Sequence, residues 1–301
     1  GLDNIVGKWN TFLGYKAGMT NTGSDNTFIG YMAGSAHESQ GGNVYIGSKA
    51  GQNATNGQQN VLIGESVGAD ITTGSYNVML GFEAGKNTEN GESNAFLGYQ
   101  AGWTNTHGKY NVFIGNGAGY SNIGTVGFPG NFNVFMGYLS GYYNQTGQDN
   151  VFIGKQSGWQ NNSGIGNVYI GMNAGAGLTD ASSNVFLGSQ AGASKTSGET
   201  NIYIGDQAGY GTTGVSNSIF IGYRAGKGQT ESNLLFIENS ESETPLIGGD
   251  FGTDRVAING KPDIGAGGAT FWVNGSIRVG YFGSRVNRIN KETTFATLPT
   301  L

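Results

Sequence analysis

A nine-residue pattern recurs thirteen times along this chain, and it constrains the fold more than any other feature of the sequence. The pattern reads Asn, a small or β-branched residue, a large apolar residue, an aliphatic residue and Gly, then two variable residues, a small residue and Gly. Ten of the twelve steps between copies are 17 residues, one is 16 and one is 22. A short fixed period predicts stacked coils, and therefore an elongated solenoid rather than a globule.

The three residues after each anchor Asn are expected to form a β-strand, because they are mostly Val, an aromatic residue and Ile or Leu. Neighbouring residues of a strand point to opposite faces, so both faces are apolar, as in a parallel sheet buried on both sides. We expect one face inside the coil and the aromatic face against identical chains around a threefold axis. The residues predicted at this trimer interface are Phe28, Tyr45, Phe96, Phe113, Phe135, Phe152, Tyr169, Phe186, Tyr203 and Phe220.

Glycines and the anchor Asn predict how each coil turns and how coils join. Three glycines recur in most copies, and we expect them at tight corners that need positive φ or close backbone approach. The anchor Asn is predicted to stack on its equivalents, with each amide bonding the next coil or the corner backbone. Copy thirteen has Ser218 in place of Asn, and we predict a small bulge there.

The repeat resembles those of two families of surface proteins. Copies such as NTFIGYMAG at residues 26–34 and NAFLGYQAG at 94–102 resemble the head repeats of trimeric autotransporter adhesins and the repeats of bacteriophage and phage-like tail-fibre proteins. The resemblance covers about residues 4–228, and it implies a trimeric, left-handed parallel β-roll exposed at a cell or virion surface. The repeat here is longer than the usual adhesin head repeat, so extra residues are expected to enlarge a corner or add a short strand.

The predicted fold is therefore all-β, a parallel β-solenoid of about thirteen 17-residue coils, homotrimeric and followed by a small β cap. Residues 1–228 form the repeat array in this reading. Residues 229–283 break the period but keep short strand signals, which predicts a cap or adaptor. Residues 284–301 are more polar and are expected to be a linker or the start of a missing C-terminal part.

Composition argues against several classes of function. The net charge of -5, with 12% charged residues, argues against a nucleic-acid partner. The absence of cysteine excludes disulfides and thiolate metal sites. The sequence contains no run of about 18 apolar residues, so no membrane-spanning helix is predicted. We expect no metal and no cofactor.

The sequence predicts no catalytic residues. His37 and His107 lie four coils apart, so we expect them to be separate surface residues rather than parts of one constellation. Carboxylates such as Glu65, Glu83 and Asp206 occupy different variable positions, with no recurrent pair of the kind that glycoside hydrolysis needs. The chain is therefore predicted not to be an enzyme.

Aromatic residues at the variable positions form the candidate ligand site. The residue after the second Gly of the motif is aromatic in four consecutive copies, and in-register stacking would align the rings in one stripe beside the long step at residues 123–132. Exposed aromatic faces with polar neighbours suit sugar rings, although the rings could instead merely stack on each other or cover the corner. The candidate residues are Trp103, Tyr120, Tyr142 and Trp159, with Tyr99 and Tyr138 nearby.

Three functions remain open at this stage. The first is a trimeric surface fibre or adhesin segment, extracellular on a cell or virion, which binds itself and a host-surface glycan or receptor without inserting into a membrane. The second is a purely structural spacer of a tail fibre or extracellular filament. The third is a monomeric solenoid that binds a polysaccharide or ice through one regular face. We favour them in that order.

Overall fold

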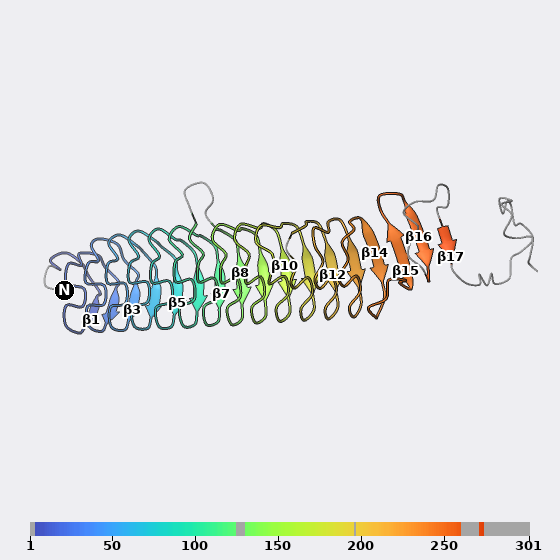
Figure 1. Ribbon diagram of the computed structural model, residues 1–301. Helices are drawn as coiled ribbons and strands as arrows, with labels where there is room; N and C mark the ends of the chain where they lie inside the picture. Colours follow the sequence, from blue (N-terminus) through green and yellow to red (C-terminus); the bar gives the residue numbers. More distant parts are fainter. Residues whose placement is uncertain (1–3, 125–129, 196, 260–270, 274–301) are drawn as a thin grey trace, which may run out of the picture.

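The protein is a straight β-solenoid. The structure, a computed structural model, describes residues 4–124, 130–195 and 197–259, together with the backbone of a strand at 271–273. All seventeen strands in these ranges belong to one sheet, and the coils stack along a rod that starts at β1 (Figure 1). The same ranges contain no helix that could cross a membrane. The predicted all-β parallel solenoid of about thirteen coils is confirmed.

Each coil contributes one short strand, and the strands of successive coils pair in parallel. Pairing follows the repeat, so that Phe96 lies opposite Phe113 and Phe135 opposite Phe152. At a spacing of about 4.8 Å per coil, thirteen coils make a rod of roughly 60 Å. The repeat strands are β1 (Thr11–Leu13), β2 (Thr27–Ile29), β3 (Val44–Ile46), β4 (Val61–Ile63), β5 (Val78–Leu80), β6 (Ala95–Leu97), β7 (Val112–Ile114), β8 (Val134–Met136), β9 (Val151–Ile153), β10 (Val168–Ile170), β11 (Val185–Leu187), β12 (Ile202–Ile204) and β13 (Ile219–Ile221).

The irregular copies leave the register of the sheet unchanged. β1 pairs with β2 across the 16-residue step and β7 with β8 across the 22-residue step, of which residues 125–129 lie outside the described ranges. The bulge predicted at Ser218 is wrong, because β12 and β13 pair without interruption. Ser218 takes over part of the anchor's bonding. Its N–H donates to Asn201 Oδ1 at 3.1 Å, and its Oγ accepts from Leu234 N–H at 3.0 Å.

The middle residue of each strand lies inside the coil, where the aromatic rings stack along the rod axis. Phe113 and Phe135 have ring centroids 4.9 Å apart and planes 8° apart. All ten residues predicted at a trimer interface belong to this ladder and are at most 1% exposed within one chain. Their assignment to an inter-chain face is therefore wrong, since no surface is left for a partner to touch.

The second Gly of the motif explains why the ring fits inside. A Cβ built on Gly119 would lie 2.5 Å from Cε2 of Phe113 in the same coil, and one on Gly158 would lie 2.4 Å from Cδ2 of Phe152. The Ala before this Gly is also buried, as at Ala118. The Ala-Gly pair is therefore more than a corner, because it makes the space inside the coil that one aromatic ring fills.

The anchor Asn residues form a continuous hydrogen-bonded ladder, as predicted. Asn150 donates its Nδ2 to Gly164 O at 2.8 Å and to Asn133 Oδ1 at 3.2 Å. Its own Oδ1 accepts from the backbone N–H of Asn167 at 2.9 Å. The side chain is fully buried, so these bonds satisfy polar groups that have no access to water.

The parallel ladder continues past residue 228 before the sheet changes direction. β14 pairs in parallel with β13, and Phe236 lies 5.4 Å from Phe220 with a tilt of 47°. The next two pairings, β14–β15 and β15–β16, are antiparallel, while β16–β17 is parallel. Residues 260–270 and 274–301, which include the predicted linker, lie outside the described ranges. The strands are β14 (Leu234–Ile237), β15 (Ile247–Asp250), β16 (Arg255–Ile258) and β17 (Phe271–Val273).

Candidate functional site

The predicted aromatic stripe exists as a stack over three coils. Trp103 and Tyr120 have ring centroids 5.0 Å apart with planes 8° apart, and Tyr120 and Tyr142 are 4.8 Å apart with planes 9° apart. The regular register of the sheet places these residues above one another. Because both faces of Tyr120 are covered by neighbouring rings, the middle of the stack offers edges rather than faces to a ligand.

The stack changes geometry at its end nearer the C-terminus. Tyr142 contacts Tyr143 edge to face at 83°, and Tyr143 contacts Trp159 at 62° with centroids 5.3 Å apart. In the next two coils the equivalent residues are Ala176 and Ala193. Trp159 is therefore the last ring of the contiguous group, and the next aromatic residue at this position of the repeat is Tyr210, three coils further on.

Tyr99 and Tyr138 belong to a second, more exposed row. They follow the first Gly of the motif and are 48% and 51% exposed. Tyr99 stacks on Phe82 of the preceding coil, with centroids 5.4 Å apart and planes 8° apart. The structure thus brings four of the six candidates, Trp103, Tyr120, Tyr142 and Trp159, into one contiguous group and leaves these two beside it.

Electrostatics vary along the stack. At its end nearer the N-terminus, Glu83 accepts from Lys86 Nζ at 2.7 Å and from Gln100 Nε2 at 2.8 Å, and the Lys86 bond in particular lowers the pKa of Glu83. Burial raises the pKa of Tyr120 and of Tyr142, with smaller effects from neighbouring acidic groups. The phenols therefore stay neutral hydrogen-bonding groups at physiological pH.

Two hollows flank Trp159. One of about 380 Å³ extends over Ala176 and Ala193 to Tyr210. The other, of about 440 Å³, lies towards Tyr143 and is lined by amide and hydroxyl side chains. Both volumes fall within the range of small-molecule sites, roughly 300–1,000 Å³.

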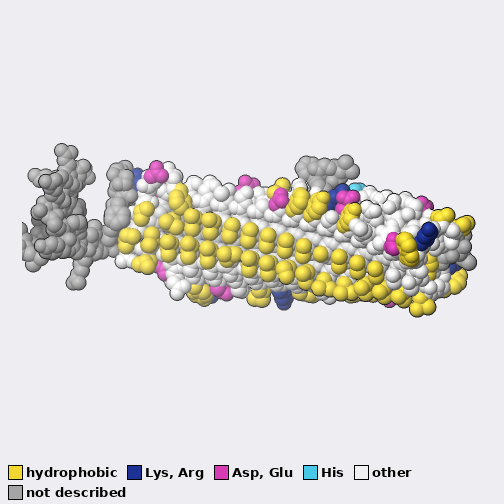
Figure 2. All heavy atoms as spheres, turned by 180° about the vertical axis from the view of Figure 1, so that it is seen from behind, with side chains coloured by type: hydrophobic (Ala, Val, Ile, Leu, Met, Phe, Trp, Pro, Cys, Tyr) yellow, Lys and Arg dark blue, Asp and Glu magenta, His cyan; other side chains and the backbone are white. Residues whose placement is uncertain are grey.

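The outer face of the strands is a second candidate surface. The first and third residues of β2–β13 are almost all aliphatic and are half-exposed or exposed, with Val78 reaching 52%. None of the residues in these strands is charged. Figure 2 shows long, continuous rows of hydrophobic side chains along one face of the rod, with charged side chains at its margins. Such a face is suited to contact with another apolar surface.

The two histidines do not form a site. The prediction that both are surface residues is wrong for His37, which is fully buried inside the coil, with its ring edge against Phe28 and Nε2 2.8 Å from Gln40 O. Burial lowers the pKa of His37. His107 is half-exposed and lies 3.0 Å from Thr106 Oγ1.

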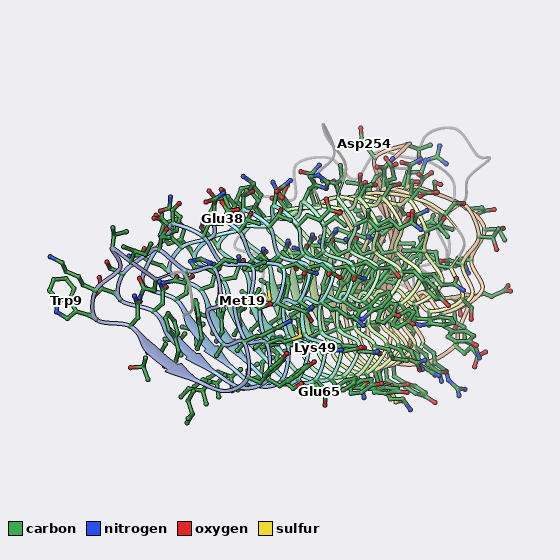
Figure 3. The ribbon with its side chains drawn as sticks, turned by 90° about the vertical axis from the view of Figure 1, so that its left-hand side faces the viewer. Trp9, Met19, Glu38, Lys49, Glu65 and Asp254 are labelled. Carbon is green, nitrogen blue, oxygen red and sulfur yellow. The ribbon has the colours of Figure 1, made fainter. Side chains whose placement is uncertain are left out.

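The carboxylates are dispersed around the coils. Viewed towards the end of the rod, Glu38 and Glu65 lie on opposite edges of the coil section (Figure 3). In the segment between β14 and β15, Glu241 pairs with Lys227 at 2.6 Å and with Arg224 at 2.9 Å. Among the described residues no group of three or more His, Asp or Glu side chains could hold a metal ion.

Sequence reasoning missed the part of the site that follows the aromatic run. It named only aromatic candidates, whereas the small residues Ala176 and Ala193 open the hollow beside Trp159. It also passed over Tyr210, which restores an aromatic residue at the same position of the repeat. The signal that could have found the groove is the change at the position after the second Gly, which in four successive coils is Trp159, Ala176, Ala193 and Tyr210.

Known proteins offer no guide to this site. Comparison of the chain with protein-family models finds no match, and comparisons with curated proteins and with solved structures find none either.

Proposed function

We propose that this chain is the shaft of a non-enzymatic, homotrimeric fibre or adhesin segment. It lies outside the cell, at a cell surface or on a virion or phage-like particle. In this role the rod gives reach, and groups on its surface attach it to a host cell, a glycan or another surface.

The exposed apolar face of the strands is the observation that carries this proposal. Thirteen coils about 4.8 Å apart, with strands about 10 Å long, give a face of roughly 600 Å². That is at the upper end for the largest apolar patch of a monomer, about 300–600 Å². It approaches the roughly 800 Å² per partner of a stable interface.

A second copy of the chain is the partner that fits this face best. Its strands have the same spacing and length, so copies related by rotation about an axis parallel to the rod meet with equivalent coils at the same level. The residues in contact would be outward-facing Val, Ile and Leu, such as Val112 and Ile114, rather than the buried aromatic ladder. The number three comes from the resemblance of the repeats to those of trimeric fibres.

The dispersed polar groups support a role in attachment rather than catalysis. General acid–base chemistry requires groups within hydrogen-bond reach of one substrate. Here one histidine is enclosed in the coil and the other is four coils away, while Glu83 and Glu241 are engaged in ion pairs. The described residues thus favour a repetitive binding or spacing surface over a reaction centre.

Native mass spectrometry of the chain, combined with electron microscopy, tests this proposal. The expected result is a mass of three chains and a particle with parallel rods. A single-chain mass at micromolar concentration would contradict the fibre and favour a monomeric binding solenoid.

A further inference from the structure

The hollow beyond Trp159 is a groove with aromatic ends and a floor of small residues. Trp159 and Tyr210 occupy the same position of the repeat three coils apart, about 14 Å at roughly 4.8 Å per coil. Between them, Ala176 and Ala193 leave the space that rings fill elsewhere in this row. The lining residues lie in the turns of the coils and not in the strands, so the groove is separate from the apolar strand face.

Backbone hydrogen bonding changes direction at this floor. In the preceding coils, the residue after the row position donates its N–H to the row-position carbonyl of the next coil, as Gln160 does to Ala176 at 3.2 Å. Beyond the floor the bond is reversed, and Gly211 donates to Ala193 of the previous coil at 2.9 Å. Both floor carbonyls are therefore already occupied.

The reversal leaves two donors without acceptors. Among the described residues, neither the Gly177 N–H nor the Ser194 N–H has a hydrogen-bond partner, although both residues line the groove. The two are neighbours, since a Cβ built on Gly177 would lie 3.5 Å from Ser194 N. Unpaired backbone donors are costly unless water or a ligand oxygen accepts from them.

The remaining polar groups are neutral. Amide side chains of Gln160, Asn173 and Gln190 line the groove and can both donate and accept hydrogen bonds. The charged Lys195 is directed elsewhere, because its Nζ donates to Val215 O at 2.6 Å inside the coil. The described lining includes no carboxylate. The groove is thus matched to a ligand with hydroxyl groups and no net charge.

We propose that this groove binds a neutral oligosaccharide, with one sugar ring packed on Trp159 and its hydroxyl groups bonded to the amides and to the N–H groups of Gly177 and Ser194. Sugar rings combine an apolar C–H face with peripheral hydroxyls, which is the combination that aromatic ends and neutral polar sides accept. The second hollow, on the Tyr143 side of Trp159, extends the surface for a longer chain. This assignment deepens the attachment role proposed above and rests on it.

The test is a glycan array followed by calorimetric titration, using the full chain. The array carries neutral oligosaccharides of hexoses and N-acetylhexosamines, together with sialylated and sulfated ones. The neutral oligosaccharide bound best is then titrated into three variants. Trp159→Ala removes an aromatic end, while Ala176→Tyr extends the ring row into the groove at a position where other coils already hold Tyr. Trp9→Ala removes an exposed tryptophan near the N-terminal end of the rod, well away from the groove, and serves as the control.

We expect a neutral oligosaccharide to bind, with affinity about tenfold weaker in Trp159→Ala and in Ala176→Tyr and within about twofold of wild type in Trp9→Ala. Circular dichroism and native mass check that each variant keeps the fold and assembly. Failure of every neutral glycan to bind, binding of acidic glycans alone, or undiminished binding by a folded Ala176→Tyr variant would overturn the assignment. Because the native mass is measured separately, these outcomes leave the fibre proposal standing or falling on its own.

Discussion

The inner and outer residues of each strand are both apolar, but they have opposite roles. The middle residue, such as Phe135, is enclosed by its own coil and stacked between the rings of its neighbours. The residues on either side, Val134 and Met136, are on the outer surface, and Met136 is 37% exposed. One chain therefore completes its own core and still presents a second apolar face. The inner residues stabilise the coil, and the outer residues are available for contact between chains.

Truncation of an inner ring should have the largest effect. Phe135→Ala is expected to cost about 3–5 kcal/mol of unfolding free energy, because it leaves a cavity between two stacked rings. Met136→Ala, one residue along and on the outer face, should cost about 1 kcal/mol in the separated chain, since its side chain is already partly in water. Urea unfolding at low protein concentration measures both. Equal losses would show that the inner and outer faces do not differ in the way described.

The inner-outer difference could be predicted only in part from the sequence. The alternating strand, the stacking of coils and the Asn ladder follow from residue types and spacing. Which face closes inward does not follow from apolarity, since Val, Phe and Ile are all apolar. The informative residues were the Ala and Gly opposite the ring, because Gly119 leaves space for Phe113 within the coil. Likewise, the groove exists because Ala176 and Ala193 lack the aromatic rings that other coils hold at this position. The reversed backbone hydrogen bonds beside them have no signal in the sequence.

Two glycines test whether lack of space inside the coil is the reason that the motif requires its second Gly. Gly158 and Gly166 have similar φ values of +59° and +68°, but a Cβ on Gly158 would lie 2.4 Å from Phe152, whereas one on Gly166 meets nothing within 4 Å. Gly158→Ala should therefore cost about 3 kcal/mol, from overpacking and left-handed strain together. Gly166→Ala should cost about 1 kcal/mol from the strain alone. Thermal unfolding of both variants measures the difference, and similar losses would contradict the account.

Substitution in the buried Asn ladder should also lower the unfolding free energy far more than substitution of an exposed Asn. Asn150→Ala removes acceptor and donor together. It leaves Asn167 N–H buried without a partner and Gly164 O with only the longer bond from Asn161 Nδ2 at 3.3 Å, at a cost of about 2–3 kcal/mol. Asn162 is exposed, so Asn162→Ala should change the unfolding free energy by no more than about 0.5 kcal/mol. Chemical denaturation compares the two. A neutral Asn150→Ala would mean that the ladder does not hold neighbouring coils together.

Lys195 is an inner residue with a charge, and it should make stability depend on pH. Burial lowers its pKa to about 8 from 10.5, so between these values the unfolded chain binds more protons than the folded one. Stability should therefore rise with pH, by about 1 kcal/mol between pH 8 and 9, one unit below the pKa of about 10 at which unfolded tyrosines ionise. Urea midpoints at the two pH values measure the rise. Lys195→Met should abolish it, and a rise that persists in this variant must come from another group.

The native mass of two matched lysine variants tests most directly whether the outer strand face joins copies of the chain. One variant carries lysine at four exposed strand positions: Val78, Leu80, Ile202 and Ile204. The other carries lysine at four exposed positions in the turns: Asn53, Asn56, Gln160 and Asn162. Assembly through the strand face predicts three chains for the wild type and the turn variant, and a single folded chain for the strand variant. A single-chain wild type, or a strand variant that remains three chains, would contradict it.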